Sequence, residues 1–203
     1  MWGFRRKVIV TTERIELRLP RMSDHAAWAR LRHENESFLR PWEPVRSGPG
    51  LSRRVFRSRV YWSRKSLDEG TGLNLLAFRT ADGVLLGSIA CRNIRRGSAQ
   101  CGTLSYWIGE SFTRQGLMTE AVEGIVDHAF YRMDLSRLEA ACLPENVASR
   151  RLLEKAGFRE EGLAESYLQI GGRWRDHVLY ARLRDDRKGV GGAGTGPGHR
   201  RSP

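Results

Sequence analysis

One stretch of the chain, residues 104–133, constrains the fold most, because a strand-like segment leads through a tight turn directly into a helix. The strand-like segment covers residues 104–108, and Gly116 stands at the end of the turn. The first amides of a helix lack intrahelical acceptors and lie at the positive end of its dipole, so they bind an anion without a charged side chain. Glycine lets the backbone approach a ligand closely. The stretch therefore predicts a phosphate cradle made of main-chain amides.

The helix after this turn is amphipathic. Its apolar residues recur at helical spacing and are Met118, Val122, Ile125, Val126, Ala129, Phe130 and Met133. A stripe of this kind packs against a hydrophobic surface in a globular domain. We therefore expect this helix to lie on a sheet.

A second helix is expected about thirty residues later. It starts near Asn146, carries Ser149 in its first turn and stops at Gly157, which is the residue type that commonly follows a helix. Asn146 and Ser149 lie three residues apart near a helix start, so both side chains can face one ligand. The alternative interpretation is that Asn146 only caps the helix and Ser149 is a polar first-turn residue.

Together the two segments resemble the GNAT acetyltransferases. The first is similar to their acetyl-CoA pyrophosphate loop, and the second to their Asn-x-x-Ser motif with a helix that ends in Ala-Gly-Phe, here 156–158. Three further segments resemble the subfamily of ribosomal-protein N-terminal alanine acetyltransferases. They are 12–18 (TERIELR), 38–44 (FLRPWEP) and 116–121 (GLMTEA). The similarity spans about residues 10–184.

The resemblance implies an α+β fold with a mixed, mostly antiparallel sheet, flanking helices and splayed central strands. Local patterns agree with such a sheet. They predict strands at 15–19, 73–79, 84–90, 138–142, 163–170 and 174–183, and one more strand that ends at 108. Helices are predicted to start at 23, to cover 51–67, and to follow 116 and 146, and a loop is predicted at 35–50. The strand at 138–142 follows a helical crossover and is expected to be parallel to its neighbour.

Length and composition favour one domain. The 203 residues suffice for one well-buried core, which we assign to 10–184, with an N-terminal extension at 1–9 and a disordered Gly/Arg-rich tail at 185–203. No segment has the roughly 20 apolar residues of a membrane span, and no signal peptide is recognisable, so a cytoplasmic location is expected. Cys91, Cys101 and Cys142 are interpreted as reduced thiols, and the histidines show no metal-binding spacing.

The formal net charge is +12. Seven basic residues and no acidic one lie between Pro44 and Leu67, so this segment presents a basic face. It could steer coenzyme A or lie beside ribosomal RNA. A solvated helix face that only maintains solubility explains the same charges equally well.

The resemblance also implies which residues hold acetyl-CoA. They are Trp107, Ile108, Arg114, Gln115, Gly116, Leu117, Met118, Thr119, Asn146 and Ser149. The chain departs from the family pattern at Thr113, where Gln or Arg is usual, and at Arg114, where Gly often follows. The main-chain amides do not depend on these side chains, so they can still donate to a phosphate. Arg114 either adds a contact to a phosphate oxygen or points to solvent. An ordinary strand–helix corner is the competing interpretation.

Acetyl transfer also needs a deprotonated amine and a proton for the departing thiolate. Ser149 is the candidate to assist the thiolate, and Tyr167 could donate to it as well. Glu165 and Glu43 are the candidate bases. An α-amino group has an intrinsic pKa of about 8, so a chain of water molecules could replace a dedicated carboxylate.

The sequence thus predicts an N-acetyltransferase that moves an acetyl group from acetyl-CoA to a primary amine, without a metal. The N-terminal amine of a ribosomal protein is the favoured acceptor. A small-molecule amine is the alternative within the same class, and a catalytically silent, basic ribosome- or RNA-binding module is the alternative outside it. The sequence leaves open whether the protein is a monomer or a homodimer.

Overall fold

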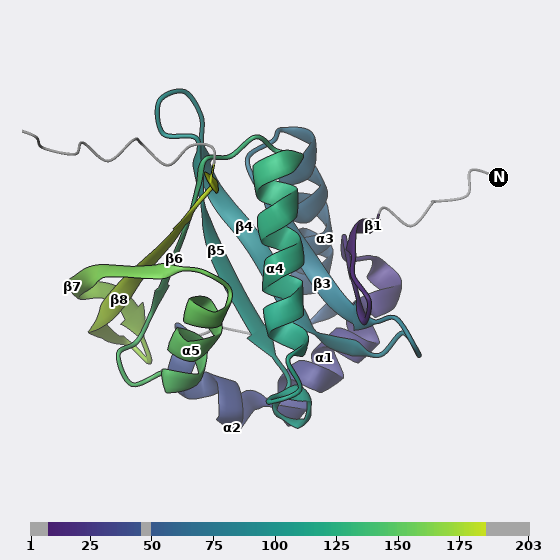
Figure 1. The fold of residues 1–203 in the computed structure, drawn as a ribbon. Coiled ribbons are helices and arrows are strands. Elements are labelled where there is room, and N and C mark those ends of the chain that lie inside the picture. Colours follow the sequence, from purple (N-terminus) through teal and green to yellow (C-terminus); the bar gives the residue numbers. More distant parts are fainter. Residues whose placement is uncertain (1–7, 46–49, 186–203) are drawn as a thin grey trace, which may run out of the picture.

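A computed structural model describes residues 8–45 and 50–185 of the chain. These residues form one eight-stranded sheet in the order β1-β2-β3-β4-β5-β6-β8-β7, with helices on both faces (Figure 1). The strands are β1 (Val8–Thr11), β2 (Ile15–Arg18), β3 (Leu73–Arg79), β4 (Leu85–Arg95), β5 (Cys101–Ile108), β6 (Arg137–Cys142), β7 (Arg159–Ile170) and β8 (Arg173–Leu183). The helices are η1 (Met22–Asp24), α1 (His25–Glu34), α2 (Glu36–Leu39), η2 (Arg40–Trp42), α3 (Arg53–Asp68), η3 (Glu110–Phe112), α4 (Leu117–Tyr131) and α5 (Val147–Lys155).

The central strands β5 and β6 are the one parallel pair in the described sheet, as predicted from the helical crossover α4 between them. They pair only over residues 101–103 and 137–139. Beyond that point β5 continues to Ile108 beside β4 alone, and β6 continues to Cys142 beside β8 alone. The predicted splay of the central strands is therefore confirmed, and it opens a gap between the two strand ends.

The helix α4 crosses one face of the sheet, with α5 beside it, while α1 and α3 cover the other face (Figure 1). Most of the predicted apolar stripe of α4 is fully buried, with Val122, Ile125, Val126 and Ala129 at 0% exposure. Trp28 and Phe56 anchor the second cluster on the opposite face. The diverging ends of β5 and β6 therefore lie between two helical layers.

The segment 35–50 is not simply the loop that the sequence predicts, because α2 and η2 lie within it. Asn35 organises the turn before α2, since its side chain donates to the Leu31 carbonyl at 2.8 Å and accepts from the Glu110 amide at 2.7 Å. Leu39 then packs into the interior at 4% exposure. Long-range bonds of this kind leave no local signal in the sequence.

The N-terminal part contains a strand and a buried ion pair that were not predicted from the sequence. Val8 and Ile9, which were assigned to the extension, lie in strand β1 beside β2. Asp24 makes no side-chain cap for α1. Its carboxylate instead binds the buried guanidinium of Arg18 at 2.8 Å and the amide of Arg21 at 2.8 Å.

The predicted C-terminal hairpin is confirmed. Its turn uses Gly171 and Gly172 with φ of 59° and 81°, values that favour glycine. The strand β7 begins at Arg159, earlier than predicted, and contains an irregularity between Ala164 and Leu168. The strand β8 lies between β6 and the edge strand β7, so residues of β8 reach close to the splayed centre.

Candidate active site

The turn before α4, called the cradle below, carries the amides for which the sequence predicts a phosphate site. Gly116 is the N-cap of α4 with φ of 75°. Leu117 and Met118 are 4% and 5% exposed, so their side chains belong to the core and only their amides face outward. In the described part of the chain, the amides of residues 115–119 donate to no protein acceptor. The start of α4 thus presents a row of free donors at the positive end of a helix dipole.

Arg14 from the start of β2 flanks this cradle. Its Nε donates to Glu120 Oε2 at 2.7 Å and its Nη1 to the Gln115 carbonyl at 3.1 Å. Its Nη2 lies 3.5 Å from the position that a Cβ on Gly116 would occupy. Arg14 belongs to the 12–18 segment, but no local pattern there marks it as a neighbour of the cradle.

The carboxylate of Glu120 holds Arg14 in place. Burial acts to raise the pKa of Glu120, but hydrogen bonds from Thr12 and from the main chain and side chain of Arg14 outweigh burial and lower it. Glu120 therefore stays ionised in the neutral range. The N-terminal hairpin and the cradle are joined by a charged contact.

The remaining cradle side chains are accessible. Arg114 is exposed, has a left-handed φ of 62° and makes no hydrogen bond or ion pair within the described residues. Gln115 Nε2 donates to the Ser111 carbonyl at 2.9 Å and so stabilises the turn. Thr119 is partly exposed in the first turn of α4. Arg114 is thus free to contact an anion held by the amides.

Trp107 and Ile108 lie at the gap. They pair with Ser88 and Gly87 of β4 on one side and have no strand partner on the β6 side. Gly87 is required there, because an added Cβ would lie 2.1 Å from the Trp107 carbonyl oxygen. The indole of Trp107 lies beneath the Arg32 guanidinium, 4.5 Å from its carbon. The free edge of β5 is where a slender ligand can enter the sheet.

Ser149 and Tyr106 meet across this gap on the α4 and α5 face. Their hydroxyl oxygens are 2.9 Å apart, and the amide of Ser149 donates to Asn146 Oδ1 at 3.1 Å. Asn146 is therefore a helix cap, while its Nδ2 has no partner among the described residues. Burial raises the pKa of Tyr106, and the hydrogen bond with Ser149 opposes this only partly. The phenol stays protonated at neutral pH and can donate a proton.

Tyr106 was missed as a site residue, although the sequence offered a signal for it. Side chains of a strand alternate between faces, so its neighbour Trp107 points to the α1 and α3 face. Only one of these two residues can face Ser149. If Trp107 lines the gap on one face of the sheet, its neighbour Tyr106 must therefore line it on the opposite face, where Ser149 lies.

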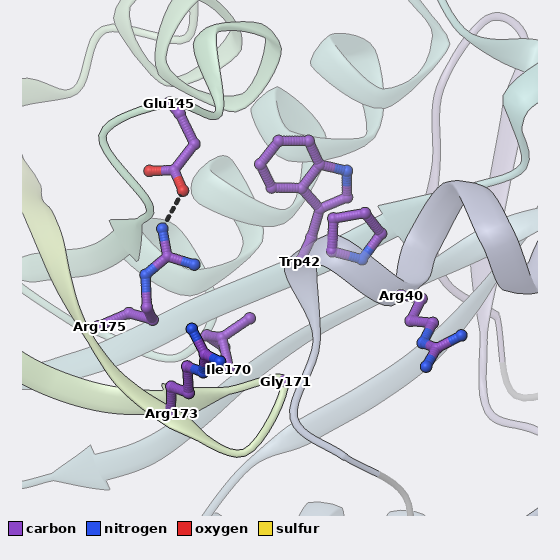
Figure 2. A pocket seen from close by; sticks show the side chains of 8 residues that line it. Arg40, Trp42, Glu145, Ile170, Gly171, Arg173 and Arg175 are labelled. Carbon is purple, nitrogen blue, oxygen red and sulfur yellow. Dashed lines mark hydrogen bonds and ion pairs between the residues drawn. The ribbon is translucent and has the colours of Figure 1, made fainter.

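On the far side of β6 lies a cleft of about 420 Å³ between η2 and the β7–β8 turn (Figure 2). Its lining residues are Arg40, Pro41, Trp42, Glu145, Ile170, Gly171, Arg173 and Arg175. Glu145 forms an ion pair with Arg175, whereas Arg40 and Arg173 have no carboxylate partner among the described residues. Glu145, which lines the cleft, lies in the segment between β6 and α5 and directly precedes Asn146.

The other predicted catalytic residues make no hydrogen bond to Ser149 among the described residues. Both oxygens of Glu43 accept from Arg32, whose exposure is only 4%, so this carboxylate is committed to an ion pair. Glu165 is exposed on the edge strand β7. The ring of Tyr167 is 5.7 Å from that of His177 and is 46% exposed. The structure brings Asn146 and Tyr106 into contact with Ser149, but it does not bring Glu43, Glu165 or Tyr167 into contact with it.

The described residues contain no cluster of three or more potential metal ligands and no helix long and apolar enough to cross a membrane. The three cysteines are free and buried. Burial raises the pKa of the Cys91 thiol to about 12. Burial also raises the pKa of Cys142, against a hydrogen bond with Ser149, so both thiols are unreactive in the neutral range.

A splayed sheet with an amide cradle at its central helix is the arrangement expected for a GNAT acetyltransferase, and the chain belongs to this family. The family model described as acetyltransferase (GNAT) domain matches residues 14–159. The protein is therefore an N-acetyltransferase that uses acetyl-CoA as its co-substrate. A catalytically silent binding module is not supported.

Particular relatives agree with the predicted subfamily. The ribosomal protein uS5-alanine N-acetyltransferase of Escherichia coli is 34% identical over 191 residues, which cover 92% of this chain and 97% of that protein. The probable N-acetyltransferase YjcK of Bacillus subtilis is 33% identical over 156 residues, 77% of this chain and 86% of the relative. The structure of Mycobacterium smegmatis RimJ in complex with CoA-disulfide superposes with a TM-score of 0.80 at 34% identity, covering 85% and 83% of the two chains.

Proposed function

We propose that this protein acetylates the N-terminal amine of a ribosomal protein. The observation that carries the proposal is the arrangement of donor and acceptor sites on opposite sides of one gap in the sheet. The amide cradle lies on the α4 side of this gap, and the open cleft lies at the end of β6 on the other side. Similarity to the uS5-alanine N-acetyltransferase supports the choice of acceptor.

The cradle is assigned to the diphosphate of acetyl-CoA. The amides of residues 115–119 supply the donors, and Arg14 and Arg114 add positive charge at the edge. Hydrogen bonds to charged oxygen are shorter and stronger than neutral ones, so this set suits a diphosphate. The pantetheine arm then follows the free edge of β5 at Trp107 and Ile108 and passes Asn146, and its thioester lies at Ser149.

Chemistry at the thioester needs a proton for sulfur. The acceptor nitrogen attacks the carbonyl carbon, the C–N bond forms, the C–S bond breaks and the electron pair stays on sulfur. The hydroxyls of Ser149 and Tyr106 are hydrogen-bonded to each other, and Tyr106 keeps its proton at neutral pH. The pair can therefore donate to the departing thiolate.

The cleft suits a polypeptide terminus more than an enclosed small molecule. It is open between two separate chain segments, η2 and the β7–β8 turn (Figure 2). Trp42 supplies an apolar wall, and Arg40 and Arg173 supply charges for carbonyl or carboxylate oxygens along a peptide. A location in the cytoplasm, near ribosomes, follows from this acceptor.

The test incubates the protein with labelled acetyl-CoA, ribosomal proteins and a panel of small amines. Mass spectrometry then locates the label. The proposal expects acetylation at the α-amine of one ribosomal protein, and it expects no label with heat-inactivated enzyme. Label only on lysine side chains or only on small amines would contradict the proposed acceptor.

A further inference from the structure

The buried side chain of His177 in β8 has one ring nitrogen bound and the other free. The residue is 3% exposed, and Nδ1 lies 2.9 Å from the main-chain carbonyl oxygen of Arg175. A carbonyl oxygen only accepts, so Nδ1 carries the proton of the neutral ring and Nε2 presents its lone pair. Within the described residues Nε2 has no hydrogen-bond partner. It is also not one of the fully buried side-chain atoms without a partner, which are Arg21 Nη2, Trp28 Nε1 and Arg32 Nε. Nε2 therefore has a small exposed surface, although the residue as a whole is buried.

The strand β8 directs this ring toward the acceptor cleft. Side chains alternate along a strand, so Arg173, Arg175 and His177 share one face, and Val178 points to the other. Arg173 and Arg175 line the cleft, whereas Val178 packs in the core with α4 and α5. His177 thus lies next in the row of side chains that begins with the two cleft-lining arginines, buried behind the cleft wall.

The same ring lies close to the reacting centre. Val178, the next residue along β8, pairs with Cys142 of β6, and Cys142 is hydrogen-bonded to Ser149. Neighbouring strands are about 4.8 Å apart. The backbone of His177 therefore lies about one strand from Cys142, which contacts Ser149 on the opposite face of the sheet. A thioester placed between β5 and β6 has its sulfur on the Ser149 face and the approaching nitrogen on the His177 face.

We propose that Nε2 of His177 is the general base of this acetyl transfer, which rests on the function proposed above. The acceptor enters as an ammonium group, and Nε2 takes one proton from it, directly or through one water molecule. The neutral nitrogen then attacks the thioester carbon as described, and as the C–S bond breaks its second proton passes through water to the Ser149–Tyr106 pair, where it replaces the proton that this pair gives to sulfur. Sulfur gains one proton from the Ser149–Tyr106 pair, and the imidazolium returns one to solvent.

The groups around the ring agree with this role. Tyr167 faces it from β7 at 5.7 Å between ring centroids, and Arg175 precedes it on the same face of β8. Glu145, from the segment between β6 and α5, is ion-paired with Arg175. No carboxylate of the described residues bonds to the imidazole, so its lone pair is available for the substrate.

The test compares His177→Gln with His33→Gln, a matched change at an exposed histidine of α1. General-base catalysis contributes roughly 100-fold or more, so we expect His177→Gln to lower kcat/KM by about that factor at neutral pH. The deficit should shrink as the pH rises past the amine pKa of about 8, because a neutral amine needs no base. Affinity for acetyl-CoA should be unchanged, and His33→Gln should behave as wild type.

An undiminished rate, or a deficit that is constant with pH, would overturn the role of His177. The comparison uses whichever amine the wild-type protein acetylates. If this amine is not a ribosomal-protein N-terminus, the proposed function is refuted, but the role of His177 can still be tested. If no amine is acetylated, slow hydrolysis of acetyl-CoA serves as the reaction, with water activated by the same base. Nitrogen NMR of the wild-type imidazole is a measurement that needs no variant, and a proton found on Nε2 of the neutral ring would refute the proposal.

Discussion

At the scale of single residues, Gly116 illustrates how one backbone conformation makes a binding site. Its φ of 75° turns the chain into α4 and leaves the following amides free. A Cβ there would meet only Arg14 Nη2, at 3.5 Å, so the protein itself has room for a side chain. The requirement for glycine comes from the left-handed conformation and from the space above the amides.

We predict that Gly116→Val abolishes measurable binding of acetyl-CoA while the protein still folds. The branched side chain disfavours the left-handed conformation by about 1–2 kcal/mol and obstructs the diphosphate. Gly97→Val is the matched control, because Gly97 has a φ of 67° and no neighbour within 4 Å, in the turn between β4 and β5. Calorimetry should show similar stability losses for both variants and lost binding for Gly116→Val alone. Wild-type affinity in Gly116→Val would remove Gly116 from the site.

Ser149 gives the second prediction at this scale. Ser149→Ala should lower kcat more than it lowers acetyl-CoA affinity, because its hydroxyl assists the thiolate only as the C–S bond breaks. The cap of α5 survives, since Asn146 accepts from the backbone amide of Ser149. Tyr106→Phe should have a similar effect, and the double variant should lose less than the product of the two factors. Equal turnover in Ser149→Ala and wild type would leave Ser149 a purely structural role.

The candidate site residues that could be predicted from the sequence are those whose position depends on local chain geometry. Gly116 and Ser149 follow from a turn and a helix start that can be recognised within a few residues. Arg14, Tyr106 and His177 were missed, because their roles depend on partners elsewhere in the chain. Arg14 reaches Glu120 across 106 positions, and Tyr106 reaches Ser149 across 43.

At the scale of elements, the pair of Arg32 and Glu43 ties η2 to α1 at the edge of the cleft. Arg32 lies over the indole of Trp107, so the same guanidinium joins α1, η2 and the end of β5. A buried guanidinium that loses its carboxylate is left with an uncompensated charge. The pair therefore fixes the position of Trp42, next to Glu43, in the cleft wall.

We predict that Glu43→Gln destabilises the protein by on the order of 2 kcal/mol and weakens acceptor binding more than acetyl-CoA binding. Denaturant unfolding and separate titrations of the two substrates measure these effects. Asp82→Asn, which removes the exposed partner of Arg79, should change stability little. A loss of kcat in Glu43→Gln with full stability and unchanged acceptor KM would instead identify Glu43 as the base.

Elements with strong periodicity or glycine turns were predictable from the sequence. The helices α3 and α4 and the hairpin of β7 and β8 lie close to their predicted ranges. The helix α2 and the strand β1 were not predicted, because the four residues of each are stabilised by tertiary contacts and not by local propensity. The placement of β8 between β6 and β7 is likewise a property of the assembled sheet.

At the scale of the whole molecule, the net positive charge adds a long-range attraction to the hydrogen bonds that the cradle offers acetyl-CoA. The formal charge is +12, and the α3 surface adds exposed Tyr61 and Trp62 among its basic residues. A strongly positive protein attracts anions such as coenzyme A over distances set by the Debye length. The amide cradle, in contrast, contributes directed hydrogen bonds that salt screens far less. Binding of acetyl-CoA should therefore have a salt-sensitive and a salt-resistant part.

This division gives a prediction for thermal unfolding. Ligand at about 100 times its Kd stabilises a protein by about 2.7 kcal/mol, which for a chain of this size corresponds to a rise in Tm of about 5–11 °C. At a fixed acetyl-CoA concentration the rise should shrink from low to high salt but persist. In Gly116→Val the rise should be absent at both salt concentrations, because net charge alone holds the coenzyme too weakly to measure. A wild-type rise that disappears at high salt, or a rise in the variant at low salt, would mean that net charge, and not the cradle, holds the coenzyme.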